Sequence, residues 1–90
     1  MEDEFLEEIE NSIKSCKEMI EYFEQKIGRR FIEKNRLEKL LETVKDKPES
    51  EKYLNLQLRL YEGSLHAETR WVEVYKSKLI VYKKILEEFE

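Results

Sequence analysis

A heptad stripe in the second half of the chain constrains the fold more than any other feature of the sequence. Apolar residues recur there at alternating steps of four and three, and Glu68 is the one polar residue at a stripe position. The apolar members are Leu54, Leu58, Tyr61, Leu65, Val72, Tyr75, Leu79, Tyr82, Leu86 and Phe89. Because this spacing places side chains on one face of an α-helix, we expect a helix over about residues 48–88 that packs against a partner helix.

The first half of the chain carries a second stripe with the same spacing. Its members are Leu6, Ile9, Ile13, Cys16, Ile20, Phe23 and Ile27, followed after a gap by Leu37, Leu41 and Val44. Arg30 and Lys34 stand in the gap, where apolar residues are due. Six acids among the first ten residues suit the positive end of a helix dipole. We therefore expect a helix over about residues 3–45, with a break at Gly28, which would give three helices, as the alternative.

The clearest interruption of the helical pattern lies at residues 45–50. Pro48 suits the first position of a helix and disfavours a helical conformation in the residue before it, so we expect Asp46 or Lys47 to cap the second helix. A turn at about residues 46–48 makes the two helices antiparallel neighbours. With two glycines and one proline in 90 residues, the sequence predicts an all-α fold, a long antiparallel helical hairpin that forms a single domain over residues 1–90.

Further apolar residues lie outside the two stripes, and a hairpin alone would leave them exposed. In the second helix we place them toward the side opposite the stripe and expect six of them to form a partner interface: Leu56, Leu60, Trp71, Val74, Val81 and Ile85. Large exposed apolar surfaces mark interaction sites. A homodimeric four-helix bundle covers them most economically, and docking on a different protein is the alternative.

The polar interruptions of the two stripes fall at one level of the hairpin. With a turn near residue 48, residues whose numbers add up to about 96 face each other in antiparallel helices, which brings Glu68 opposite the region of Ile27 to Arg30 and Lys34 opposite Glu62. Polar residues at such positions can fix the register of two helices, so we interpret Arg30, Lys34 and Glu68 as a register layer. A functional site in the bundle centre is the alternative, but it would need more inward polar groups, so we expect no catalytic residue, no metal and no cofactor.

Residues 26–39 form the one strongly basic segment of a chain whose formal net charge is −4. Its cations are Lys26, Arg29, Arg30, Lys34, Arg36 and Lys39, and its acids are Glu33 and Glu38. The segment is either a solvated helix face with pairs such as Arg29–Glu33 and Lys34–Glu38, or a surface for an anionic partner. In the second case Lys26, Arg29, Arg30, Arg36 and Lys39 are the candidate anion-binding residues.

These features favour a non-enzymatic structural or adaptor protein, a hairpin dimer or accessory subunit that mediates protein–protein interaction. A nucleic-acid-associated regulator that acts through residues 26–39 is the alternative. We expect His66 on the surface and Cys16 in the core. No apolar run approaches the ~20 residues of a membrane span, and the acidic start differs from a basic signal peptide. We therefore expect a cytoplasmic protein that has no membrane contact and no small-molecule substrate.

Overall fold

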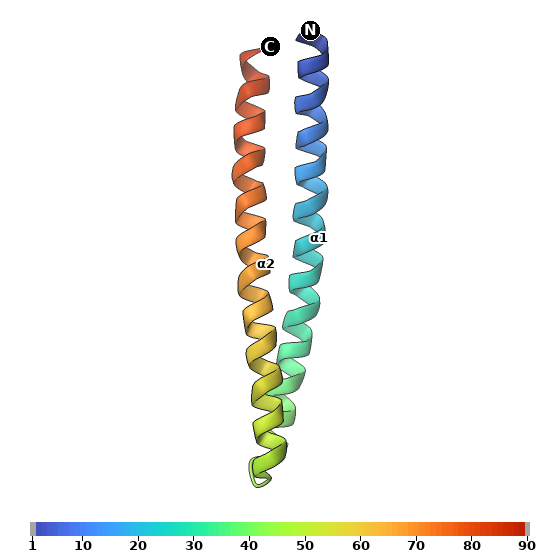
Figure 1. The fold of residues 1–90 in the computed structure, drawn as a ribbon. Helices are drawn as coiled ribbons and strands as arrows, with labels where there is room; N and C mark the ends of the chain where they lie inside the picture. The colour runs from blue at the N-terminus through green and yellow to red at the C-terminus, as the bar shows by residue number, and fades with distance from the viewer. Residues whose placement is uncertain (1, 90) are drawn as a thin grey trace.

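Two long α-helices make up almost the whole chain in the computed structural model, which describes residues 2–89. Helix α1 spans Glu2–Thr43, helix α2 spans Pro48–Glu88, and residues 2–89 contain no strand. The helices lie side by side and antiparallel, so that the start of α1 and the end of α2 lie at one end of a rod and the turn lies at the other (Figure 1). The predicted all-α helical hairpin is confirmed. The rod measures 68 × 15 × 14 Å, and its radius of gyration is 20.1 Å, compared with ~12 Å for a compact chain of this length.

Helix α1 runs without interruption through Gly28. No glycine among the described residues has a positive φ angle, and the neighbouring Ile27 and Arg30 remain half-buried against α2. An interior glycine costs a helix only about 1 kcal/mol relative to alanine, which the contacts on either side offset. The alternative of three helices, broken at Gly28, is therefore wrong.

The end of α1 lies two residues before the predicted boundary at 45. After Thr43, the Val44 N–H donates to the Leu41 carbonyl at 3.2 Å. This bond spans three residues instead of four, which tightens the last turn and directs the chain out of the helix.

The start of α2 agrees with the prediction at Pro48. Of the two expected cap residues, Lys47 occupies the cap position with φ −120° and ψ 91°, and its side chain makes no capping hydrogen bond. Asp46 therefore does not cap the helix. Glu49 and Glu51 lie in the first turn of α2, where their negative charge complements the helix dipole.

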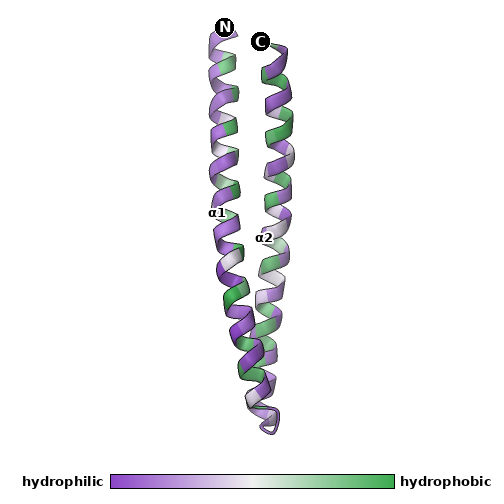
Figure 2. Cartoon of the chain, turned by 180° about the vertical axis from the view of Figure 1, so that it is seen from behind, coloured by the Kyte–Doolittle hydropathy of each residue, from purple (hydrophilic) through white to green (hydrophobic). Residues whose placement is uncertain are grey.

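The core of the hairpin is the single seam between the two helices. Its buried apolar residues are Ile9 and Cys16 on α1 and Leu65 and Val72 on α2. The remaining stripe residues through Leu86 are half-buried, and hydrophobic residues recur along both helices (Figure 2). Among residues 2–89, none is fully buried. A single seam between two helices thus buries few side chains, because each helix has only one neighbour.

Candidate functional site

An ion pair between Arg30 of α1 and Glu68 of α2 crosses the seam. The Arg30 Nε donates a hydrogen bond to the Glu68 Oε1 at 2.6 Å. The side chain of Glu68 is 10% exposed and that of Arg30 is 31% exposed. The pair is therefore partly removed from water, where salt screens charges less than it does at the open surface.

The second carboxylate oxygen of Glu68 is buried and has no hydrogen-bond partner among the described residues. A buried acceptor left without a partner costs roughly 1–3 kcal/mol, so this pair adds little net stability. We expect the pair to favour this register, because a slip of one heptad would set Glu68 beside Phe23 or Leu37 in place of Arg30. The geometry thus fits a role in alignment of the helices better than a role in their overall stability.

Lys34, the third residue assigned to the register layer, makes weaker contacts. Its Nζ lies 3.9 Å from an oxygen of Glu38 and 3.9 Å from an oxygen of Glu62. Both acids are about half exposed, and exposed pairs of this kind contribute less than about 1 kcal/mol. We therefore expect Arg30 and Glu68 to contribute more than Lys34 to the choice of register.

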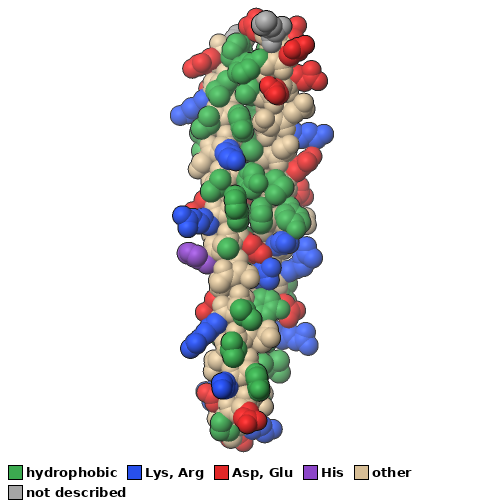
Figure 3. Space-filling model, viewed as in Figure 1, with side chains coloured by type: hydrophobic (Ala, Val, Ile, Leu, Met, Phe, Trp, Pro, Cys, Tyr) green, Lys and Arg blue, Asp and Glu red, His purple; other side chains and the backbone are tan. Residues whose placement is uncertain are grey.

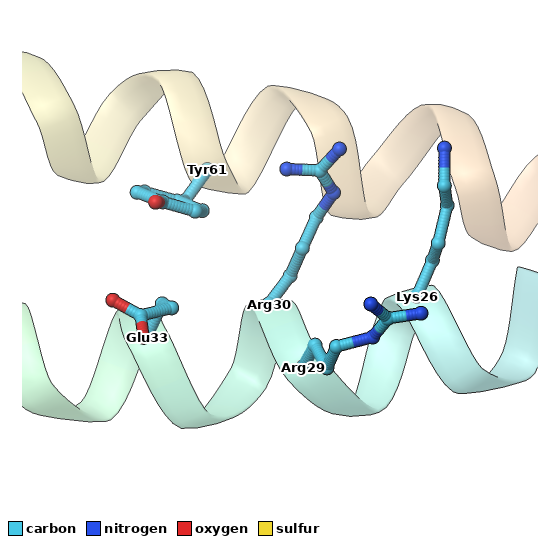
Figure 4. A pocket seen from close by; sticks show the side chains of 5 residues that line it. All are labelled: Lys26, Arg29, Arg30, Glu33 and Tyr61. Atoms are coloured by element: carbon cyan, nitrogen blue, oxygen red, sulfur yellow. The ribbon is translucent and has the colours of Figure 1, made fainter.

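The first half of the basic segment borders a shallow groove of about 250 Å³. The groove is lined by Lys26, Arg29, Arg30, Glu33 and Tyr61. Lys26 and Arg30 reach toward α2, whereas Arg29 lies along α1 (Figure 4). The Lys26 ammonium lies 4.8 Å from the centre of the Tyr22 ring, and Arg30 is bound to Glu68. Two of the three cations at this groove are thus engaged within the chain.

The second half of the basic segment lies at a different groove. Arg36 and Lys39 are exposed farther along α1, where they line this groove together with Ile32 and Leu40. Of the two intrahelical pairs expected from the sequence, Lys34–Glu38 is present, and Arg29–Glu33 is not among the ion pairs of residues 2–89. The candidate anion-binding residues are therefore divided between two grooves.

Trp71 and Ile85 lie beside the seam, one residue before the stripe residues Val72 and Leu86, whereas the spacing had predicted them on the side opposite it. Leu56 is two residues, about 200° of helix, from stripe residues on either side of it, so helix geometry places it on the side opposite the seam. Leu56, Leu60, Trp71, Val74 and Val81 are exposed, and Ile85 is half-buried. Trp71 precedes the buried Val72 by one residue, which is about 100° around the helix, so it lies at one edge of the seam. Tyr75 follows Trp71 by four residues and is its neighbour on the helix surface, with ring centres 6.1 Å apart.

An aromatic cluster at this edge joins the two helices and was not predicted from the sequence. Tyr75 stacks on Phe23 of α1 with ring centres 6.1 Å apart, and Phe23 in turn contacts Tyr22 at 5.4 Å. The register rule that aligns Arg30 with Glu68 also aligns Phe23 with Tyr75, so the spacing contained the signal. Trp71 and Tyr22, the outer members of the cluster, are each about half exposed.

We call this side of the hairpin the apolar face. It comprises Trp71, Val74, Val81 and Ile85 of α2 with Met19 and Tyr22 of α1. Hydrophobic side chains gather there over both helices, in the half of the rod nearer the chain ends (Figure 3). An exposed ion pair between Glu24 and Lys76, at 3.5 Å, joins the helices at the other edge of the seam.

Other residues singled out in the sequence have simple surroundings. His66 is exposed on α2, and Cys16 is buried with a free thiol. Within residues 2–89, no three or more His, Cys, Asp or Glu side chains are grouped so that they could hold a metal ion. Neither described helix contains an apolar stretch long enough to cross a membrane.

Comparison of the chain with protein-family models, with curated proteins and with solved structures finds no match. The function proposed below therefore rests on the exposed surface and the polar layer of the chain.

Proposed function

We propose that this chain is a non-enzymatic structural or adaptor protein, a helical hairpin that pairs with a second hairpin in a four-helix bundle. The amount of uncovered surface carries this proposal. The hairpin exposes 7301 Å², whereas a compact monomer of its 11.1 kDa exposes ~5,700 Å². The excess of about 1,600 Å² is twice the ~800 Å² that each partner contributes to a standard protein–protein interface.

The chemistry of the uncovered surface supports a protein partner. Trp71 is 50% exposed and Tyr22 is 47% exposed, and tryptophan and tyrosine are enriched among residues that dominate binding energy. Val74 and Val81 extend the same surface along α2. In a four-helix bundle each helix gains a second neighbour, which would cover the apolar face.

Light scattering at micromolar concentration tests the assembly. We expect a mass of about twice the 11.1 kDa of the chain, and a monomer mass would contradict the proposed dimer. Trp71→Lys should give the monomer, because it places a charge in the apolar face. His66→Lys is the matched control on the same helix and should leave the dimer intact. If the hairpin serves instead as an accessory subunit, it remains monomeric alone and binds another protein through the face that contains Trp71.

A nucleic-acid-associated regulator is the second candidate, and the exposed Arg29, Arg36 and Lys39 favour it. The division of the basic residues between two grooves and the net charge of −4 weaken it, because polyanion binding rests on neutralising several phosphates together. Fluorescence anisotropy with labelled DNA and RNA at ~50 mM salt tests it. Binding that Arg29→Glu abolishes would support this function, and an absence of binding would eliminate it.

A further inference from the structure

Two residues of opposite charge flank the α1 part of the apolar face along the helix. Glu8 lies at a groove that also contains Ser12 and Lys78, and Arg29 lies at the groove beside Tyr61. Glu8 and Arg29 are separated by 21 positions, or about 31 Å along a helix, so they cannot pair within one chain. A second copy of α1 laid antiparallel on the first brings Arg29 of each copy beside Glu8 of the other.

The apolar residues of α2 have a spacing that is nearly symmetric about Lys78. Trp71 and Ile85 lie seven residues to either side of it, and Val74 and Val81 lie four and three residues away. If a second copy of α2 lies antiparallel on the first, with Lys78 of one copy facing Lys78 of the other, then Trp71 faces Ile85 and Val74 faces Val81. Large apolar residues would meet one another along this contact.

The two helices give the same symmetry axis independently. The pairing of Arg29 with Glu8 is centred close to Met19, and the pairing of the α2 residues is centred on Lys78. Met19 and Lys78 lie at about the same level of the hairpin, since their numbers add up to 97 and those of the bonded Arg30 and Glu68 add up to 98. A single two-fold axis perpendicular to the rod thus produces both the pairing of α1 with its copy and the pairing of α2 with its copy.

We propose that a second copy of this chain packs on the apolar face in an antiparallel arrangement, with the two turns at opposite ends and the two-fold axis at Met19 and Lys78. This inference rests on the proposed dimer and specifies its face and register. The overlap covers residues 2–36 of α1, about 52 Å, and residues 67–89 of α2, about 34 Å, on a rod that is 15 Å wide. The covered area is then about 650 Å² per chain, within the range of roughly 600–1,000 Å² per partner for a standard specific interface.

The arrangement with both turns at one end matches the charges poorly. In that dimer α1 of one copy lies level on α2 of the other, so Trp71 faces Lys26, and Arg29 faces Ala67 without an acid opposite it. The antiparallel arrangement gives Arg29 a carboxylate and gives Trp71 an apolar partner. Lys78 then lies beside its own copy, and its long stem lets the ammonium extend outward; its Nζ already lies 5.5 Å from the centre of the Tyr75 ring.

Disulfide cross-linking tests the axis, because only residues near a two-fold axis lie beside their own copies. A disulfide requires Cα atoms within about 7 Å. In a Cys16→Ala background, we expect Lys78→Cys and Met19→Cys each to give a covalent dimer on mild oxidation. Thr43→Cys, near the turn, is the matched control and should remain uncross-linked.

The outcomes separate this inference from the proposed function. Suppose that light scattering shows a dimer. Cross-linking of Thr43→Cys would then overturn the antiparallel arrangement but not the dimer, and so would a failure of both Lys78→Cys and Met19→Cys to cross-link. A monomer mass for the Cys16→Ala background would overturn both.

Charge exchange tests the register by a separate route. Arg29→Glu and Glu8→Arg, each made alone, should raise the dissociation constant of the dimer about tenfold, because each places like charges together twice in the dimer. The double variant should return to within about threefold of the original value. Sedimentation equilibrium over a dilution series measures all three, and a double variant that is no tighter than the single variants contradicts the proposed register.

Discussion

Replacement of Arg30 by methionine should destabilise the protein far more than its position on a half-exposed helix would suggest. The substitution keeps an unbranched side chain about as long as the arginine stem but removes the guanidinium group and with it the donor to Glu68 Oε1 at 2.6 Å. Glu68 Oε2 already lacks a hydrogen-bond partner among the described residues. In the variant both oxygens of a carboxylate that is 10% exposed would therefore lie in the seam without a cation.

The magnitude follows from the burial of the two side chains. Removal of one partner from a fully buried ion pair costs about 3–5 kcal/mol. Arg30 is 31% exposed, so water can reach part of this layer, and we expect a loss of about 2–3 kcal/mol. In a chain of this size the loss corresponds to a fall in Tm of roughly 10–20 °C. The double variant Arg30→Met, Glu68→Leu should recover most of this loss, because an apolar pair can replace a buried ion pair without penalty.

Urea denaturation followed by circular dichroism measures these free energies, at one fixed protein concentration because assembly contributes to stability. Lys34→Met is the matched control, since its contacts at 3.9 Å lead to half-exposed acids, and it should cost less than about 1 kcal/mol. A loss below about 1 kcal/mol for Arg30→Met, or a double variant no more stable than Arg30→Met alone, would refute the assignment of a buried, paired carboxylate to the seam.

Three further predictions concern helix stability, packing and association. Gly28→Ala should raise the free energy of unfolding by about 0.5–1 kcal/mol, because a methyl group at this position would meet no neighbouring side chain within 4 Å. A lower Tm for the variant in thermal denaturation would indicate that Gly28 is needed as a hinge. Leu65→Ala should lower the free energy of unfolding by about 2–4 kcal/mol, because Leu65 is 7% exposed. If chemical denaturation shows that this free energy falls by less than about 1 kcal/mol, the seam is loosely packed at Leu65. The emission of Trp71, the one tryptophan, should shift to shorter wavelength as the concentration rises through the dimer transition, and a spectrum independent of concentration in a dimer would place Trp71 outside the interface.

The seam and its polar layer could be predicted from the sequence because both depend on the spacing of residues along the chain. The alternation of threes and fours identifies the residues that face the partner helix, and Pro48 locates the turn. Once the turn is fixed, antiparallel geometry assigns opposite numbers to within a few residues, which is why the sequence alone places Glu68 opposite the region of Ile27 to Arg30; the ion pair with Arg30 shows that facing residues add up to 98 and not 96. The end of α1 at Thr43 was less accessible, because it depends on the hydrogen bonds that close a tight turn.

The sequence by itself therefore determined two helices, their direction and their approximate register, since each of these follows from spacing along the chain. The tertiary structure decided on which side of the seam the remaining apolar residues lie. Trp71 is about 100° from Val72 on an isolated helix, and the spacing alone did not reveal that it shares one edge of the hairpin with Tyr22. Only when α1 packs against α2 do Phe23 and Tyr75 stack and join the two outer rings into one apolar face. That face depends on how two helices are rotated toward each other, and this rotation is set by packing in three dimensions.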